Sequence, residues 1–229
     1  AFEILVVDNN SSDNTASIVE QYPVELAFER GIQTPGAARN RGIALTKEEI
    51  IAFIDSDCIA ESDWLCNLVP PFRDPDVGVV GCRIEGQEHE PNLVEDFLGQ
   101  VRVLDETRFR AMEPRGFPTT AVAYRRSALD RVGIFDPLME ASEDVDLAWR
   151  VQAYGGYLGV YVPDAIVYNK HRSKLSGMFH QFRRYGFSEI VLTTRFRHET
   201  FHRRTPTSQL LDMMRQLRAL GTYTLSFAI

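Results

Sequence analysis

Short runs of apolar, β-branched residues alternate along the chain with segments in which apolar residues recur at helical spacing. The runs at 2–8, 24–29 and 50–55 predict buried strands, and the segment at 37–46 predicts a helix between the last two. A further helix, ending near Gln21, is expected after "NNSSDNT", which supplies N-cap residues. This alternation favours an α/β fold, with a mostly parallel sheet covered by helices.

The second half of the chain continues the pattern more loosely. The run at 77–86 predicts a strand, and the segment at 92–112 predicts a long helix. The segment at 142–156 predicts another helix, with Ser142 as its N-cap, and 157–168 is expected to be extended.

The composition is that of a folded protein with one sizeable core. The chain has 229 residues, of which 44% are apolar and 25% charged. Its three cysteines, Cys58, Cys66 and Cys82, form no C-x-x-C pair, so the sequence indicates neither a disulfide framework nor a thiolate zinc site. A reducing, cytosolic compartment fits this cysteine usage best.

The net charge of −7 hides an asymmetry between the body of the chain and its C-terminal part. Residues 170–218 hold 11 Lys or Arg against 3 Asp or Glu, so a basic segment follows an acidic body. Within this segment Leu210, Met214 and Leu217 recur at helical spacing, which is typical of an amphipathic helix.

The strongest candidate for chemistry is the pair Asp55 and Asp57, which comes directly after five apolar residues. In an open α/β sheet, ligands bind beyond the carboxyl ends of the strands, where this pair is expected to lie. Two such charges about 4 Å apart repel by roughly 4 kcal/mol at an effective dielectric constant of ~20, which favours binding of a cation. Carboxylate oxygens suit Mg²⁺ or Mn²⁺. The alternative is a helix N-cap followed by a solvated turn.

Other polar residues at predicted strand and helix ends each allow two interpretations. Asp8 is a turn residue or a hydrogen-bond acceptor for a nucleobase. Arg39 lies on a solvated helix face or binds a base or diphosphate. Glu143 and Asp144 stabilise the start of a helix, or one of them accepts a proton from an attacking hydroxyl. His171 is a surface residue or a metal ligand.

Taken together and in this order, these motifs resemble the family 2 glycosyltransferases with the GT-A fold. The matching runs are "ILVVDNNSSDNT", "GAARNRGI", "IIAFIDSDC", "SEDVDLAWRVQAYG" and "VPDAIVY", which cover roughly residues 2 to 170. The resemblance therefore implies a GT-A catalytic domain at 1–170.

The resemblance implies a donor site built on the D-x-D motif, Asp55-Ser56-Asp57. Asp57 is expected to ligate Mn²⁺ or Mg²⁺ on the diphosphate of a nucleotide-sugar donor, and Asp55 to contact the donor ribose or share the metal. Asp8 matches the acidic residue that contacts the base, and Arg39 matches the arginine near it.

On the acceptor side, the resemblance implies that Asp144 is the general base of an inverting transfer, with Glu143 beside it. The segment 116–120 is expected to line the pocket for the donor sugar and the acceptor. The implied activity is metal-dependent transfer of a hexose-type sugar to a hydroxyl of a saccharide or lipid-linked acceptor, in cell-surface polysaccharide or glycolipid synthesis.

The chain departs from the family pattern in two places. The family's first strand and helix should precede Ala1, so the chain is expected to be truncated at its N-terminus. Truncation at the C-terminus is expected as well, because the sequence stops in the apolar run "GTYTLSFAI" without a polar close. Family members often carry histidine where this chain has Asn169, and His171 follows two residues later. His171 is therefore the expected third metal ligand, although it lies outside the matched position.

For the basic segment, the resemblance implies an amphipathic helical tail at 171–229 on the cytoplasmic face of the plasma membrane. Arg and Lys near anionic lipid contribute roughly 1 kcal/mol each. The alternative is a helix that packs on the catalytic domain. No nucleic-acid-binding module is recognised in the sequence, so nucleic acid is not an expected partner. The aromatic residues expected at the lipid interface are Phe179, Phe182, Tyr185 and Phe187.

Two other functions fit parts of the sequence. Haloacid-dehalogenase-type phosphatases also carry D-x-D after an apolar strand and use the first aspartate, here Asp55, as nucleophile. Their pattern continues with Gly-Thr, whereas Cys58-Ile59 follows here. A non-catalytic fragment that binds a nucleotide sugar is the second alternative.

Overall fold

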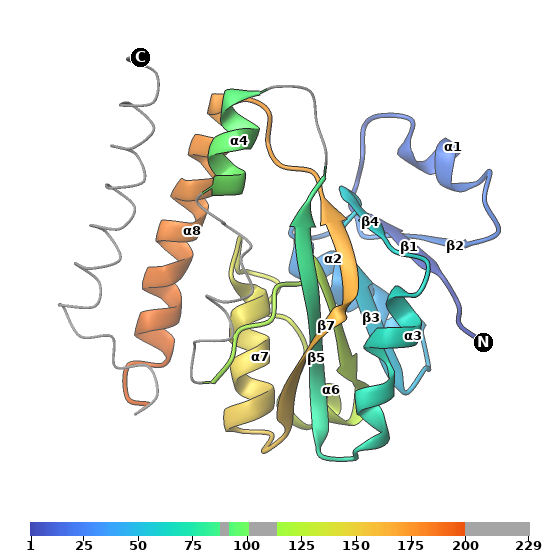
Figure 1. Cartoon of the computed structure of the whole chain (residues 1–229), viewed down its shortest axis with the longest axis vertical. Coiled ribbons are helices and arrows are strands. Elements are labelled where there is room, and N and C mark those ends of the chain that lie inside the picture. Colours follow the sequence, from blue (N-terminus) through green and yellow to red (C-terminus); the bar gives the residue numbers. More distant parts are fainter. Residues whose placement is uncertain (88–91, 101–113, 200–229) are drawn as a thin grey trace.

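The computed structural model describes residues 1–87, 92–100 and 114–199 (Figure 1). The described part is an α/β arrangement in which helices cover a central five-stranded sheet, and a short two-stranded parallel sheet lies beside it. The strands are β1 (Leu5–Asp8), β2 (Glu25–Phe28), β3 (Ile50–Ile54), β4 (Cys58–Ala60), β5 (Val77–Gly86), β6 (Ala121–Arg125) and β7 (Leu158–Asn169). The helices are α1 (Thr15–Val19), α2 (Pro35–Leu45), α3 (Trp64–Leu68), the 3₁₀ helix η1 (Pro70–Arg73), α4 (Leu93–Gln100), α6 (Arg126–Val132), α7 (Glu143–Ala153) and α8 (Leu175–Arg195).

The central sheet is mixed, whereas a mostly parallel sheet was expected. Its order is β3-β6-β5-β7-β4, in which β5 and β7 are parallel. Strand β6 runs antiparallel to both of its neighbours, and β4 runs antiparallel to β7. An apolar run identifies a strand without revealing its direction, so the alternation of elements alone overestimated the parallel pairs.

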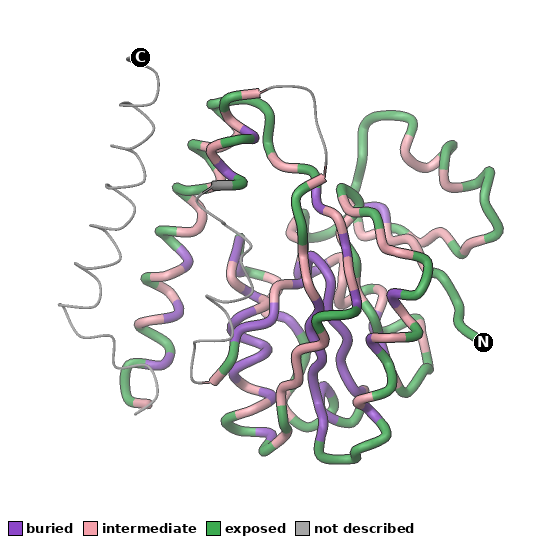
Figure 2. The backbone as a smooth tube through the Cα atoms, in the orientation of Figure 1, coloured by how far each residue is buried: buried purple, intermediate pink, exposed green. Residues whose placement is uncertain are grey.

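Two hydrophobic clusters fill the space on the two faces of the sheet, and Figure 2 shows the buried residues concentrated there. On β6, Val122 and Tyr124 point to the face covered by α2, α6 and α7, while Ala121 and Ala123 point to the face covered by α3 and η1. This alternation follows the two-residue period of a strand. The sheet therefore forms the middle of three layers.

The absence of a side chain at Gly81 makes room for the ring of Phe117. A Cβ atom at Gly81 would lie 2.5 Å from Phe117 Cδ1. Phe117 is 2% exposed and belongs to the cluster under α7. This contact fixes the start of the segment that leads into β6, which matters because that segment reaches the candidate site.

Helix α8 lies along α7 and packs against it through a third apolar cluster (Figure 1). Leu192 and Phe196 contact Val145 and Trp149 in this cluster. Arg195 pairs with Asp146, which is fully buried, at 2.7 Å. The described part of the basic segment therefore packs on the α/β body through α7, as the alternative interpretation expected.

The other face of α8 carries exposed apolar side chains. Phe179 is 64% exposed and Phe187 62%, and Phe182 is also exposed, whereas Tyr185 is half-buried and bonded to Gln181. Among the described residues, no helix is long and apolar enough to cross a membrane. The repeat of Leu210, Met214 and Leu217 lies outside the described residues.

The predicted elements agree with the structure in order, and several are shorter. The predicted strand at 2–8 begins at Leu5, and the helix expected at 142–156 spans Glu143–Ala153. Ser142 occupies the N-cap position in a left-handed conformation, with φ of 59°, and its side chain makes no capping hydrogen bond, contrary to expectation. The part of the expected helix at 92–112 that follows Gln100 lies outside the described residues.

Candidate functional site

Asp8 and Asp55 stand at the carboxyl ends of two strands, β1 and β3. Asp8, the last residue of β1, is 5% exposed, and its Oδ1 accepts a hydrogen bond of 2.7 Å from the backbone N–H of Ser11. Asp55 follows β3, and its backbone N–H donates to the carbonyl of Thr120 at 3.1 Å. Ser56 and Asp57 are exposed.

Arg39 connects the D-x-D motif to the start of α7. Its Nη2 lies 2.8 Å from Asp55 Oδ1, and its Nη1 lies 2.6 Å from Glu143 Oε1. The side chains of Arg39 and Glu143 are 14% and 7% exposed, and that of Asp55 is 36% exposed. Two different carboxylates, 16 and 104 residues away in sequence, are thus held by one guanidinium group.

The helix that carries Arg39 is anchored to the segment before α7. Asn40 donates to the carbonyl of Phe135 at 2.9 Å and accepts from its backbone N–H at 3.1 Å. Thr34 Oγ1 donates to the carbonyl of Pro137 at 2.7 Å and caps α2 by accepting from Ala37 N. A Cβ atom at Gly36 would lie 3.1 Å from the carbonyl oxygen of Asp136, so glycine permits this close approach. These contacts anchor the part of α2 that carries Arg39 to residues 135–137, which precede α7.

Asp144 lies in the first turn of α7, where its carboxylate accepts two backbone hydrogen bonds. Oδ1 accepts from Val145 N at 2.8 Å, and Oδ2 accepts from Thr119 N at 3.2 Å. The segment 116–120 therefore contacts Asp144 through Thr119 and Asp55 through the carbonyl of Thr120. The segment thus contacts both candidate aspartates, and its expected role in lining a pocket for the donor sugar and the acceptor stays a prediction.

The environment of Asp144 changes the affinity of its carboxyl group for a proton. Desolvation of the carboxyl group, followed by the charge of Glu143, raises its pKa to about 7, although the guanidinium of Arg39 and the two N–H donors oppose this shift. The pKa of Asp55 is also raised by desolvation, and Arg39 opposes that shift too. A carboxyl group with a pKa near neutral pH is suited to accept a proton during a reaction.

The pairing of β4 with β7 brings Asn169 beside Asp57. Asn169 is 7% exposed, and its Nδ2 donates to Asp57 Oδ1 at 3.3 Å and to Cys58 Sγ at 3.2 Å. The backbone N–H of Lys170 donates to the carbonyl of Asp57 at 3.0 Å. Burial raises the pKa of the Cys58 thiol to about 12, so this cysteine remains protonated beside the aspartate.

The donor atoms at Asp57 fit a hard divalent cation. Its carboxylate is exposed, receives a single long side-chain N–H bond and offers oxygen ligands, whereas one oxygen of Asp55 is already paired with Arg39. Within the described ranges, no three His, Cys, Asp or Glu side chains are close enough together to hold a metal ion. Asp55, Asp57 and His171 thus do not form a three-residue site, and the ring of His171 lies against Gly86 at the end of β5.

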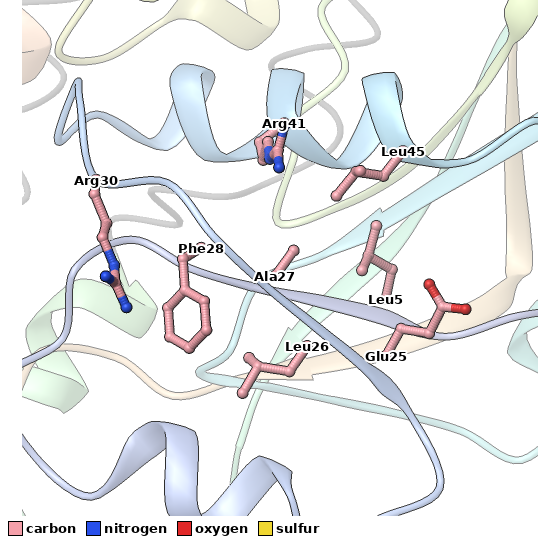
Figure 3. A pocket seen from close by; sticks show the side chains of 8 residues that line it. All are labelled: Leu5, Glu25, Leu26, Ala27, Phe28, Arg30, Arg41 and Leu45. Atoms are coloured by element: carbon pink, nitrogen blue, oxygen red, sulfur yellow. The ribbon is translucent and has the colours of Figure 1, made fainter.

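A cavity of about 570 Å³ lies elsewhere, between the β1–β2 pair and α2 (Figure 3). None of the candidate catalytic or donor-binding residues lines it. Apolar and charged side chains line it together, and the guanidinium of Arg30 lies over the ring of Phe28, 4.6 Å from the ring centroid. The lining residues are Leu5, Glu25, Leu26, Ala27, Phe28, Arg30, Arg41 and Leu45.

Asn40 and Asn169 contribute to this site although neither was among the predicted site residues, and Thr119 was named only as part of the segment 116–120. Asn40 anchors α2, Thr119 donates a backbone N–H to Asp144, and Asn169 donates a hydrogen bond to Asp57. Asn40 lies inside the "GAARNRGI" run, so its position was a usable signal. Thr119 acts through its backbone N–H, so the identity of its side chain does not reveal this role. Asn169 had been noted only because family members often carry histidine at that position.

The comparisons with known proteins show the family and the fold of the chain. Residues 1–133, more than half of the chain, match the model of glycosyl transferase family 2. A pre-mycofactocin glycosyltransferase from Mycobacterium tuberculosis is 32% identical over 200 residues, which are 84% of this chain and 42% of that protein. A beta-monoglucosyldiacylglycerol synthase from Trichormus variabilis is 36% identical over 168 residues, 66% of this chain and 34% of that protein. The chain thus spans less than half of these relatives.

Solved structures share the fold. A mannosyltransferase from Pyrobaculum calidifontis, solved in complex with GDP-Man and Mn²⁺, has a TM-score of 0.57 at 27% identity and covers 80% of this chain and 51% of its own. Glucosyl-3-phosphoglycerate synthase from Mycobacterium tuberculosis has the same TM-score at 19% identity, over 77% and 62% of the two chains. The family match, the fold and the order of the acidic motifs do not favour a haloacid-dehalogenase-type phosphatase. This chain belongs to glycosyl transferase family 2 and has the GT-A fold.

Proposed function

We propose that this protein transfers a sugar from a nucleoside diphosphate donor to a hydroxyl group of a saccharide or lipid-linked acceptor, with inversion at the anomeric carbon. The observation that carries the proposal is the environment of Asp144. Its carboxyl group lies at the start of α7 and has a pKa raised to about 7. The preceding residue, Glu143, is connected to Asp55 of the D-x-D motif through Arg39. A proton acceptor and a donor-binding motif are thus parts of one site.

Asp144 acts as the general base in this proposal. Thr119 N and Val145 N hold both of its oxygens, so the carboxylate is oriented before the acceptor arrives. Desolvation increases its basicity, which favours removal of the proton from the acceptor hydroxyl as that oxygen attacks the sugar. Glu143 is held by Arg39 and serves to position the helix start rather than to accept the proton.

The donor occupies the edge formed by the ends of β1 and β3. Asp57, oriented by Asn169, would hold Mn²⁺ or Mg²⁺, which supplies electrostatic stabilisation of the leaving diphosphate when bound. Asp55 contacts the donor ribose, and Asp8 receives a hydrogen bond from the base. Ser56 lies between the two aspartates and is exposed toward the donor. His171 remains a candidate for a contact with the metal once the donor is present.

We place the protein at the cytoplasmic face of the plasma membrane, with residues 1–170 as the catalytic unit. The exposed apolar face of α8 and the basic residues of the tail support contact with an anionic lipid surface. The beta-monoglucosyldiacylglycerol synthase among the relatives is consistent with a lipid acceptor.

A direct experiment incubates the full chain with UDP-glucose, UDP-N-acetylglucosamine and GDP-mannose, with Mn²⁺ or Mg²⁺, in the presence of lipid extracts or short saccharides. Release of nucleoside diphosphate together with a glycosylated product supports the proposal. Metal-dependent binding of UDP or GDP without any product would instead support a binding module, and absence of both would contradict the proposed function.

A further inference from the structure

We propose that Arg39 is a positioning residue that joins the donor-side carboxylate Asp55 to the acceptor-side helix α7 through Glu143. This inference rests on the proposed function, because it concerns how the donor-binding residue Asp55 and the helix that carries the general base are held relative to each other. The role expected for Arg39 was a contact near the nucleobase. In the structure, Nη2 of Arg39 contacts Asp55 and Nη1 contacts Glu143 instead.

The connection consists of two separate ion pairs on one rigid group. Nη2 contacts Asp55 Oδ1 at 2.8 Å and Nη1 contacts Glu143 Oε1 at 2.6 Å, so each carboxylate has its own nitrogen. Guanidinium is planar, and its donors have fixed directions. A shift of the first turn of α7 therefore displaces Asp55, and a shift of Asp55 is transmitted to the turn that carries Asp144.

The guanidinium is itself held in place. Asn40, the next residue on α2, forms two reciprocal hydrogen bonds with the backbone of Phe135, and the guanidinium of Arg39 lies 5.7 Å from the centroid of the Phe135 ring. Since the side chain of Arg39 is 14% exposed, its ion pairs are screened little by solvent.

Arg39 also separates the tasks of the acidic residues around it. It pairs with Asp55 and Glu143, while Asp57 stays exposed and Asp144 is held by backbone N–H groups. Without a cation between them, Asp55 and Glu143 would be two partly buried carboxylates with no shared counter-charge. Their repulsion would widen the site on the side where donor and acceptor must meet.

The test compares Arg39→Lys and Arg39→Gln with the control Arg41→Gln, an exposed arginine on the same helix. The ammonium of Arg39→Lys keeps the charge but cannot hold two carboxylates in fixed directions. We expect kcat to fall about 100-fold in both variants, while the affinity for UDP or GDP with Mn²⁺, measured by calorimetry, falls by a smaller factor, because Asp57 and Asp8 do not depend on Arg39 for their contacts. Arg41→Gln should retain the kcat of the unmodified protein.

Wild-type kcat in Arg39→Lys would overturn the proposal, as would an equal loss in Arg41→Gln. A second measurement does not need turnover: the effect of Asp55→Asn on the urea midpoint. When Arg39 is present, Asp55→Asn removes the attraction between Asp55 and Arg39, so we expect the urea midpoint to fall. In the Arg39→Gln background the same change removes the repulsion between Asp55 and Glu143, so we expect the midpoint to stay unchanged or rise. An equal lowering in both backgrounds would contradict the connection.

These readouts also separate this proposal from the proposed function. If the unmodified chain releases no nucleoside diphosphate from any donor tested, the proposed function fails, and the urea measurement still decides whether Arg39 connects the two carboxylates. If the unmodified chain is active but the Arg39 variants match it, the function stands and the positioning role fails.

Discussion

The backbone N–H of Thr119 donates a hydrogen bond of 3.2 Å to Oδ2 of Asp144. The segment that enters β6 thereby orients the carboxylate at the start of α7, although the two residues are 25 positions apart. A desolvated carboxylate with two backbone donors is prepared to accept a proton without moving, which is the property expected of a general base.

The rate of transfer should depend on the ionisation of Asp144. Its pKa is raised to about 7 in the ligand-free chain, and the base must be ionised to act, so kcat/KM should rise about tenfold per pH unit below pH 7 and level off above it. Asp144→Asn should lower kcat by about 10²–10⁴-fold and remove this rise. Pre-steady-state or steady-state rates between pH 5 and pH 9 measure both effects.

The exposed Asp63, which makes no capping hydrogen bond at the start of α3, provides the matched control. Asp63→Asn should leave the pH profile unchanged. A profile that still rises through pH 7 in Asp144→Asn would assign the titration to another group and remove Asp144 from the role of base.

Metal-dependent donor binding should require Asp57. Calorimetry with UDP and GDP, with and without Mn²⁺, should show that Asp57→Ala loses at least about tenfold in the metal-dependent affinity. Asn169→Ala should give a smaller loss, because Asn169 orients Asp57 through a long hydrogen bond of 3.3 Å and is not itself an expected ligand. Affinity in Asp57→Ala equal to that of the unmodified chain, at the same Mn²⁺ concentration, would contradict this assignment.

The exposed apolar face of α8 should contribute to lipid binding. Replacing Phe179 and Phe187 with serine should reduce sedimentation of the chain with vesicles that contain anionic phosphatidylglycerol, because both rings are largely exposed and available to the interface. Binding should also weaken as salt increases, since basic residues contribute.

For lipid binding, Tyr154→Ser is a control, because Tyr154 is 52% exposed but lies on α7's C-terminal cap rather than on α8. Sedimentation that is equal for the double variant and the control would indicate that α8 serves solely as a helix packed on the catalytic body.

The contact between α7 and α8 should be sensitive to loss of Asp146. This carboxylate is fully buried and pairs with Arg150 at 2.8 Å and with Arg195 at 2.7 Å. Asp146→Ala leaves two arginines without their buried partner, so the free energy of unfolding should decrease by about 3–5 kcal/mol. Urea denaturation measures the decrease, and Asp130→Ala, at an exposed position of α6, should change stability by less than about 0.5 kcal/mol.

Much of the local structure could be predicted from the sequence. The strand at 77–86 was predicted with its observed bounds, and the runs before Asp8 and Asp55 were correctly assigned as strands, of which one ends at Asp8 and the other at Ile54, directly before Asp55. Apolar periodicity and capping residues are local signals, because they depend on the backbone geometry of a few neighbouring residues. The motif order also sufficed to identify the family.

Contacts between distant segments required the folded chain. No local signal shows that Arg39 pairs with Glu143 at a separation of 104 residues. Nor does one show that Asn169 lies beside Asp57, a contact that arises because β4 pairs antiparallel to β7. Strand direction, and with it the mixed order of the sheet, also depends on how the connections pack. The sequence therefore specified which acidic residues stand at the ends of strands and helices. The packing of the folded chain decided that Asp55 and Glu143 share the guanidinium of Arg39 and that the carboxyl group of Asp144 is desolvated. Both depend on distances between segments that meet only in the folded protein.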